Sequence, residues 1–226
     1  MSNLRFAILA LPALLTLSAC EDPAKDAPKA TVMTAAPTAK ATTAPMATGA
    51  AMQAAPAGGA EALTLDPAST VGFVGSKVTG KHEGKFEKVS GSISLAGGKA
   101  EGGKLEIDVD VASLKSDQEK LDGHLKSPDF FDVAKFPKAT FTSTDIKLGG
   151  EKGATHTITG DLTLHGEKKT ISFPATITVG ADSVSGTAEF SINRKDFKIV
   201  YPGKPDDLIR DEVVLKLALK APRKKG

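Results

Sequence analysis

The sequence has few of the residues that mark disulfide-stapled or nucleic-acid-binding proteins. It contains one cysteine, so no disulfide can form within the chain, and it has no tryptophan and one tyrosine. Lysine and arginine (29) nearly balance aspartate and glutamate (27). Basic residues do not alternate with aromatics in the manner of RNA-binding motifs. We therefore expect no nucleic-acid partner.

Histidine is also scarce, and its spacing does not suggest metal chemistry. No pair stands at i, i+4 on a helix and no cluster with cysteine occurs, so we predict no metal and no cofactor. His124 lies near Asp129 and Asp132 in the sequence and could form an acid–base pair with one of them. No nucleophile motif accompanies it, and we predict that the protein is not an enzyme. The four histidines are His82, His124, His156 and His165.

The first 20 residues have the pattern of a bacterial lipoprotein signal. Arg5 is the only charge before an apolar run over 6–17, which is too short to span a membrane. A Leu-Ser-Ala-Cys sequence that ends at Cys20 resembles the lipobox; a chance cysteine after an ordinary secretion signal is the alternative. We predict a signal peptide over 1–19, acylation of Cys20, anchoring in a membrane by the acyl chains, and a periplasmic or cell-surface location.

Residues 21–60 lack every large apolar side chain except methionine and valine. Leucine, isoleucine and all aromatics are absent, and alanine, proline and threonine dominate. Such a segment cannot bury enough apolar surface to offset its ordering entropy. We predict that 20–60 is the lipidated cysteine followed by a disordered tether, which would span about 35 Å as a flexible coil.

Residues 61–222 have the composition of one globular domain, followed by a basic tail at 223–226. Apolar and polar residues alternate through this region with a period of two, most clearly over 105–112. The phase changes between Phe141 and Ile146, which predicts a β-bulge there. Strands are expected near residues 71–74, 93–95, 105–112, 140–148, 158–164, 171–179, 184–192 and 213–220.

About eight strands of this kind fit an all-β fold, either a closed antiparallel barrel or a two-sheet sandwich. A barrel of this size is either filled by its own side chains or holds one small ligand. Small residues that interrupt the apolar stripes favour a cavity, although glycine at a barrel bend is a competing explanation. These small residues are Gly160, Ala175, Gly186 and Ala188.

One short helix is expected over 117–126, as a cap on the barrel. Ser116 and Glu119 match a capping box, Leu114, Leu121 and Leu125 would share one helix face, and Pro128 ends the helix. Phe130 and Phe131 follow. Adjacent residues of a strand face opposite sides, so we expect one ring to pack inward and the other to cover something else, as in a plug or a lid over the barrel.

Several segments resemble the YceI-like family over roughly residues 62–220. The matching segments are 80–86 (GKHEGKF), 124–132 (HLKSPDFFD), 136–143 (FPKATFTS), 160–166 (GDLTLHG) and 193–197 (NRKDF). The chain departs from the usual pattern at three places. His165 stands where asparagine is usual, Lys198 stands where glycine is expected, and residues 200–203 make a longer turn.

The resemblance implies a lipocalin-like antiparallel barrel that encloses a long isoprenoid, such as a polyprenyl phosphate or a quinone tail. His124, Arg194 and Lys195 are the candidates for contact with a headgroup. The residues predicted to line the ligand site are Phe73, Phe86, Leu121, Leu125, Phe130, Phe131, Phe141, Leu162, Phe173 and Phe190.

Three functions of different classes stay open at this point. The first is a membrane-tethered module that stores, transports or sequesters an isoprenoid or another long-chain amphiphile. The second is an enzyme that acts on such a lipid. The third is a filled barrel used for protein–protein contacts, and a homodimer is compatible with the sequence. The first fits the resemblance best.

Overall fold

Twelve β-strands form one curled antiparallel sheet in the computed structural model, which describes residues 22–33 and 60–223. The sheet order is β2-β5-β6-β8-β9-β10-β11-β14-β3-β4-β7, and β1 pairs with β10. A further hairpin joins β12 and β13. The strands are β1 (Thr31–Met33), β2 (Ala60–Thr64), β3 (Thr70–Lys77), β4 (Gly80–Phe86), β5 (Val89–Ala96), β6 (Lys99–Asp110), β7 (Leu114–Ser116), β8 (Lys138–Leu148), β9 (His156–Leu164), β10 (Glu167–Val179), β11 (Ser183–Asn193), β12 (Gly203–Lys204), β13 (Asp207–Leu208) and β14 (Glu212–Pro222); the helical elements are η1 (Val111–Ser113), α1 (Glu119–Lys126), η2 (Glu151–Gly153) and η3 (Arg194–Phe197).

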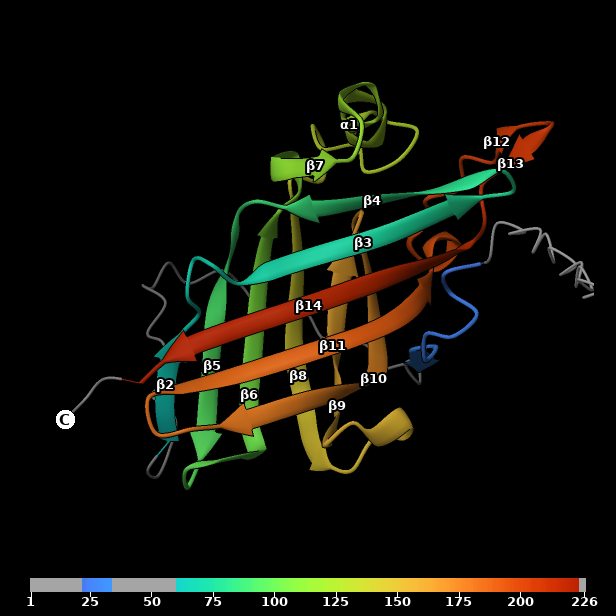
Figure 1. Cartoon of the computed structure of the whole chain (residues 1–226). Coiled ribbons are helices and arrows are strands. Elements are labelled where there is room, and N and C mark those ends of the chain that lie inside the picture. The colour runs from blue at the N-terminus through green and yellow to red at the C-terminus, as the bar shows by residue number, and fades with distance from the viewer. Residues whose placement is uncertain (1–21, 34–59, 224–226) are drawn as a thin grey trace, which may run out of the picture.

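The curled sheet makes a half-barrel. Strands β3, β4, β11 and β14 cross in front of β5, β6 and β8, and α1 covers one end (Figure 1). Strand β10 turns the corner between the two layers, because residues 167–175 pair with β9 and residues 176–179 pair with β11. The predicted all-β antiparallel barrel with one short helix is confirmed, although the sheet has more strands than the eight expected.

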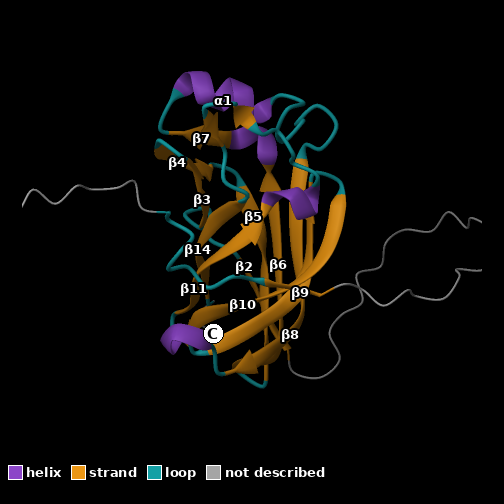
Figure 2. Cartoon of the chain, turned by 90° about the vertical axis from the view of Figure 1, so that its right-hand side faces the viewer, coloured by secondary structure: helices purple, strands orange, loops and turns teal. Residues whose placement is uncertain are grey.

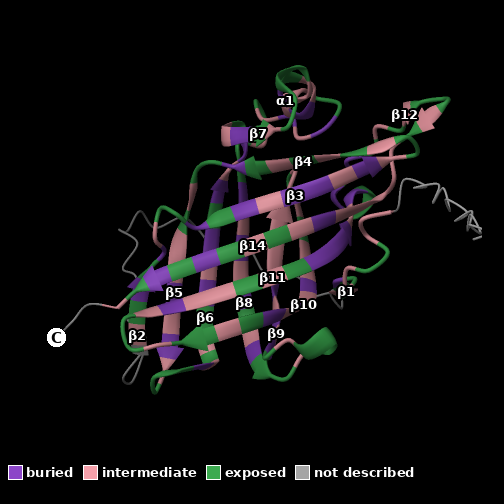
Figure 3. Ribbon diagram, viewed as in Figure 1, coloured by how far each residue is buried: buried purple, intermediate pink, exposed green. Residues whose placement is uncertain are grey.

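The residues that alternate with a period of two occupy opposite faces of the strands, as predicted. Leu105, Ile107 and Val109 of β6 are buried, and the residues between them are half-buried or exposed, an alternation that Figure 3 shows along most of the long strands. The register of β8 against β9 shifts between Ser143 and Asp145, which confirms the predicted bulge. The apolar faces of both layers therefore meet in one interior.

Two family positions where this chain departs from the usual residue have positive φ angles. His165 (φ 51°) and Gly166 (φ 76°) form the two-residue turn between β9 and β10, and Lys198 (φ 58°) ends η3. Asparagine and glycine adopt this region most easily. Side-chain contacts accompany the departures here: the Nδ1 atom of His165 lies 3.1 Å from the carbonyl oxygen of Phe197, and Lys198 pairs with Glu167.

Helix α1 begins at Glu119 and ends at Lys126, two residues before the predicted stop at Pro128, but the predicted capping box is wrong. The N-cap is Gln118, which makes no side-chain cap hydrogen bond. The hydroxyl and the backbone N–H of Ser116 both donate to the carboxylate of Asp122, at 2.6 Å each. This carboxylate ties the helix to β7 from inside the first turn.

The proposed helix face is also corrected at one end. Leu114 is fully buried in β7, where it pairs with Phe86 of β4, so it does not belong to the helix. Leu121 and Leu125 remain on the face of α1 that covers the barrel interior. The single helix therefore packs over the end of the sheet where β4 and β7 form its last strands (Figure 2).

The predicted tether is corrected over its first part, because residues 22–33 are bound to the barrel. Ala30 is buried, and its N–H donates to the carbonyl of Ser191 in β11 at 2.8 Å. β1 then pairs with residues 170–172 of β10, so the segment lies where β10 and β11 diverge. Backbone pairing holds it, which a count of large apolar residues does not detect. The signal peptide, Cys20 and residues 34–59 lie outside the described residues.

Candidate functional site

A cavity of about 330 Å³ lies beneath α1 at one end of the half-barrel. Its walls come from β3, β4, β11 and β14, and the segment that follows η3 forms its rim. Apolar side chains dominate the lining, which is typical of a small-molecule site. Its lining residues are Phe73, Gly75, Ser76, Lys77, His82, Phe86, Leu121, His124, Leu125, Phe130, Phe131, Leu164, Ile192, Arg194, Ile199, Tyr201, Gly203, Lys204, Asp207, Ile209, Val213 and Leu215.

The structure brings many of the predicted site residues together around this cavity. They come from segments far apart in the sequence: the β3–β4 hairpin, α1 with the turn after it, and η3. The predicted residues that line the cavity are Phe73, Phe86, Leu121, Leu125, Phe130, Phe131, His124 and Arg194.

The adjacent rings of Phe130 and Phe131 both face this cavity. The expectation that one would point elsewhere assumed strand alternation, but residues 127–131 form turns rather than a strand. Phe130 is 8% exposed, and its ring centroid lies 4.9 Å from that of His124 and 5.2 Å from that of Tyr201. Phe131 is half-buried and packs edge-on against Phe86 at 6.0 Å. The two rings thus close neighbouring parts of one cavity.

Polar groups gather at the rim of the cavity, and most of them are already paired. His124 Nε2 lies 3.1 Å from the carboxylate of Asp129, and Lys77 pairs with Asp207. The hydrogen bond from Lys77 is the main cause that holds the pKa of Asp207 below its ordinary value. The hydroxyl of Ser76 differs: it is buried, lines the cavity and has no hydrogen-bond partner in the protein. A buried hydroxyl of this kind calls for a polar atom of a ligand or a water.

Arg194 is buried and is used mainly by the protein itself. Its guanidinium donates to the carbonyls of Ile199 at 2.7 Å, Arg210 at 3.1 Å and Ile209 at 3.3 Å, and to the carboxylate of Asp211 at 3.2 Å. Burial lowers the pKa of Arg194, and Asp211 opposes that shift. These bonds fold the loop over 199–210 around the cavity, so Arg194 shapes the rim even where it does not touch a ligand.

The remaining predicted residues lie elsewhere. Lys195 does not line the cavity, and its ammonium pairs with Asp211 at 2.8 Å. Phe173 and Phe190 stack with ring centroids 4.1 Å apart, and Phe141 packs on Phe173 at 5.4 Å. Leu162 is half-buried in β9, opposite Phe141. Phe141, Leu162 and Phe190 belong to the packed interior rather than to the cavity lining.

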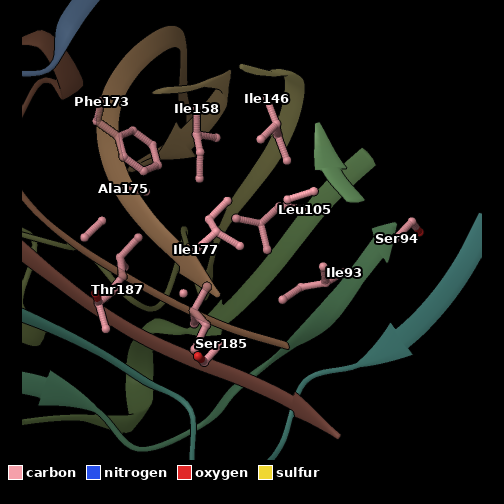
Figure 4. Close-up of a pocket in the computed structure, with 15 residues that line it drawn as sticks. Ile93, Ser94, Leu105, Ile146, Ile158, Phe173, Ala175, Ile177, Ser185 and Thr187 are labelled. Atoms are coloured by element: carbon pink, nitrogen blue, oxygen red, sulfur yellow. The ribbon is translucent and has the colours of Figure 1, made fainter. Parts of the chain in front are cut away.

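A second, much smaller cavity of about 30 Å³ lies on the other side of these rings. Figure 4 shows Ile93, Leu105, Ile158, Phe173 and Ile177 converging on it. The residues of β11 show the order of the two cavities along the strand. Gly186 and Ala188 line the small cavity, Phe190 follows, and Ile192 lines the large one. The stacked pair Phe173–Phe190 therefore separates a filled end from an open end.

The small residues predicted to leave space divide into two groups. Ala175, Gly186 and Ala188 line the small cavity. Gly160 does not leave space, because a Cβ atom there would lie 2.5 Å from the ring of Phe141. The Phe141 ring covers this glycine, so the prediction of a void at Gly160 is wrong.

Sequence reasoning missed the loop over 199–210 as part of the site. Ile199, Tyr201, Lys204 and Ile209 line the cavity, and β12 and β13 form a hairpin at its edge. The sequence signal for this loop is the longer turn at 200–203, which departs from the usual family pattern. An insertion beside a site is a natural way to reshape its rim.

Within the described residues, no group of three or more histidine, cysteine, aspartate or glutamate side chains could hold a metal ion. No helix in that part of the chain is long and apolar enough to cross a membrane.

A curled antiparallel sheet with an apolar cavity under a single helix is a lipocalin-like architecture. The chain belongs to the YceI-like domain family, whose model matches residues 63–221. A UPF0312 protein of Pseudomonas putida is 39% identical over 126 residues, which are 53% of this chain and 65% of that protein. The chain thus spans just under two thirds of that relative's length. A UPF0312 protein of Pseudomonas fluorescens is 38% identical over 138 residues, 58% of this chain and 71% of that protein.

Two solved structures are similar in fold. The crystal structure of BcnA from Burkholderia cenocepacia has a TM-score of 0.60 and 28% identity, and the match covers 70% of this chain and 99% of that one. A polyisoprenoid-binding domain from Saccharophagus degradans has a TM-score of 0.56 over 71% of this chain and 98% of that one. Its identity is 19%, so that likeness concerns the fold alone.

Proposed function

We propose that this protein binds a long-chain amphiphile in the cavity beneath α1, and that it stores, transports or sequesters this lipid without chemical change. The observation that carries the proposal is the cavity of about 330 Å³, which is lined mainly by aromatic and aliphatic side chains and includes the buried, unpartnered hydroxyl of Ser76. The apolar chain points toward Phe173, and the polar end lies at the rim near Ser76 and Lys204.

An isoprenoid is the ligand class that we favour. Its branched chain suits a cavity walled by the rings of Phe73, Phe86, Phe130 and Phe131. The name of the Saccharophagus degradans domain, a polyisoprenoid-binding domain, supports the same class. Binding rather than catalysis fits the polar rim, because His124, Lys77 and Arg194 are engaged by partners within the protein.

The test is mass spectrometry of organic extracts from natively purified protein, with a matched pair of glycine variants. A Cβ atom at Gly75 or at Gly186 would meet nothing within 4 Å, and these residues line the large and the small cavity respectively. We expect a co-purifying isoprenoid in the wild type, a strong loss of it in Gly75→Leu, and retention in Gly186→Leu. Overpacking by Gly186→Leu should instead cost about 1–3 kcal/mol of stability. A wild-type extract without lipid would contradict the proposal.

We also propose that acylated Cys20 anchors the protein to a membrane facing the periplasm or the cell surface. Support comes from the sequence at 17–20 and from the cysteine being the only one in the chain. The intact mass of the mature wild type should include the acyl chains, and Cys20→Ser should release the protein into the soluble fraction. A soluble wild type without added lipid mass would refute the anchor.

A further inference from the structure

We propose that the rim of the large cavity is itself a membrane-contact surface, so that the cavity opens onto the bilayer from which its ligand comes. The surface consists of the β3–β4 turn over 77–81 and the loop over 198–210, here called the tip. This inference rests on the proposed lipid binding and goes beyond it, because it gives the route of the ligand. It does not depend on acylation of Cys20.

The tip carries large apolar side chains that point into solvent. Val200 is 61% exposed, Val78 is 57% exposed and Leu208 is 50% exposed. Only three other large apolar side chains among the described residues are comparably exposed, and they lie on β1, β8 and β10. Exposed apolar side chains that gather at one end of a molecule mark an interaction surface.

Backbone contacts hold the parts of the tip together. The N–H of Val78 donates to the carbonyl of Leu208 at 3.2 Å, and Lys77 forms a β-bridge with Ile209. The N–H of Ile209 donates to the carbonyl of Pro202 at 2.9 Å, which brings the segment after Val200 alongside. In Figure 1 the β12–β13 hairpin projects beyond the end of β3. The exposed apolar side chains thus stand on connected loops at one end.

The charges of the tip fit an anionic lipid surface. The segments 77–81 and 198–210 contain five basic and two acidic residues, a net charge of +3. Four of the basic side chains also pair with carboxylates of the protein, namely Lys77, Lys81, Lys198 and Arg210, and Lys204 at the cavity rim has no such pair in the described residues. Lysines beside apolar side chains are the composition that binds at the headgroup boundary of anionic membranes. A protein partner would be expected to offer acidic groups to these lysines, whereas a bilayer offers both phosphates and an apolar layer.

The cavity opens at the tip. Tyr201, Gly203, Lys204, Asp207 and Ile209 line the cavity, and their neighbours Val200, Pro202 and Leu208 are exposed. A lipid that leaves the bilayer between these residues therefore enters the cavity without crossing water.

The docked N-terminal segment independently points the tip toward the membrane. The carboxylate of Asp22 accepts from the guanidinium of Arg210 at 3.1 Å, and Lys29 pairs with Glu212 at 2.7 Å. Arg210 follows Ile209, which lines the cavity. One residue, Glu21, separates Asp22 from Cys20, so the two Cα atoms are at most about 7 Å apart. An acyl anchor on Cys20 would thus hold the tip, rather than the far end of the barrel, at the membrane.

Vesicle binding by the mature chain from residue 20 onward with Cys20→Ser tests the proposal, because that variant has neither the predicted signal peptide nor an acyl anchor. Co-sedimentation is measured with vesicles of phosphatidylethanolamine and phosphatidylglycerol. Replacing Val78, Val200 and Leu208 by serine should weaken binding by roughly ten- to a hundredfold, since each removes apolar carbons from the contact. Leu148→Ser is the matched control: Leu148 is 69% exposed on β8, at the far end from α1, and should have no effect. Equal loss in the control, or no vesicle binding by the Cys20→Ser protein, would overturn the proposal.

A site-specific probe provides a second measurement that does not require loss of binding. In the Cys20→Ser background, Leu208→Cys and Leu148→Cys each introduce a single thiol for an environment-sensitive fluorophore. Emission from position 208 should shift to the blue when vesicles are added, and emission from position 148 should not. A shift at 148 alone would exclude the tip as the contact. The lipid content of the variant with serine at 78, 200 and 208 is measured separately and shows whether the cavity still binds lipid. Loss of membrane contact by the tip is thereby distinguished from failure of the proposed lipid binding.

Discussion

The two ends of the barrel interior share strands β11 and β14 yet differ about tenfold in free volume. The end beneath α1 contains a cavity of about 330 Å³, and the opposite end contains one of about 30 Å³. β11 and β14 contribute residues to both: Ile192 and Leu215 to the open end, Gly186 and Leu219 to the filled end. The strands that the two ends share therefore do not explain the difference.

The elements that close each end do explain it. At the filled end aliphatic side chains from β5, β6, β8 and β9 reach across to meet β11 and β14 directly. At the open end α1 and the loop over 199–210 span the interior, and Arg194 fixes that loop through backbone carbonyls. Helix α1 and the loop over 199–210, which is held by hydrogen bonds, leave a cavity that directly opposed strands would fill. These two elements therefore keep the large cavity open.

The largest effect should come from joining the two ends. Phe173 is 2% exposed and stacks on Phe190, so Phe173→Ala should cost about 3–5 kcal/mol in the free energy of unfolding, measured with denaturant. If Phe173→Ala still folds, it should also bind ligands with longer chains, because the stacked rings no longer separate the two cavities. Phe173→Leu is the milder control. Unchanged chain-length preference in a folded Phe173→Ala protein would show that the rings do not separate the ends.

A smaller effect on stability, with a larger effect on binding, is expected at the open end. Phe131 is half-buried against Phe73 and Phe86 and faces the cavity, so Phe131→Ala should cost the ligand-free protein about 1–2 kcal/mol. Ligand dissociation should speed up about tenfold, because lost contacts usually act on the dissociation rate. Stopped-flow release of a fluorescent isoprenoid measures this.

Phe130→Ala is the comparison for that experiment. Phe130 is more buried, in an aromatic cluster with His124 and Tyr201, and its loss should act more on stability, by about 3 kcal/mol. If both variants unfold the ligand-free protein and leave the release rate unaltered, residues 130 and 131 form a core plug and the lid interpretation is wrong.

The smallest expected effect is a pH dependence of the stability that Asp122 contributes to α1, the helix that covers the large cavity. Hydrogen bonds from the Ser116 hydroxyl, more than any other cause, hold the pKa of Asp122 below its ordinary value. A lowered carboxylate pKa stabilises the fold fully above the unfolded value of about 4, and this contribution is lost as the pH falls through the folded value. The difference in unfolding free energy between wild type and Asp122→Asn should therefore be constant from about pH 7 to 5 and shrink below about pH 4. A difference that persists in acid would contradict this role.

Much of the sheet follows from the sequence, because strand alternation is a local signal. The buried positions of β6 and the bulge in β8 could both be read from the phase of the apolar residues. The aromatic residues at the cavity carried a weaker signal. Sequence patterns placed Phe131 and Phe173 in one interior, but only three-dimensional packing assigns the first to the open end and the second to the partition.

The parts that were not predicted depend on contacts between distant residues. Ser116 looked like a helix cap from its spacing to Glu119, yet its hydroxyl bonds to Asp122, one turn into the helix. Gly160 looked like empty space, yet the ring of Phe141 covers it. Residues 22–33 looked like a tether because their composition offers little to bury, and composition carries no information about free backbone groups elsewhere in the sheet.

That docked segment has a consequence for the integrity of the sheet. Residues 28–33 fill the seam where β10 and β11 separate, and they satisfy backbone groups of Ser191 on one side and of residues 170–172 on the other. The family model matches from residue 63, so a chain truncated to the matched residues lacks the segment that lies between β10 and β11. It would present two unpaired strand edges, which are templates for pairing with another copy. In the full chain the N-terminal segment thus covers both strand edges, although it lies outside the residues that the family model matches.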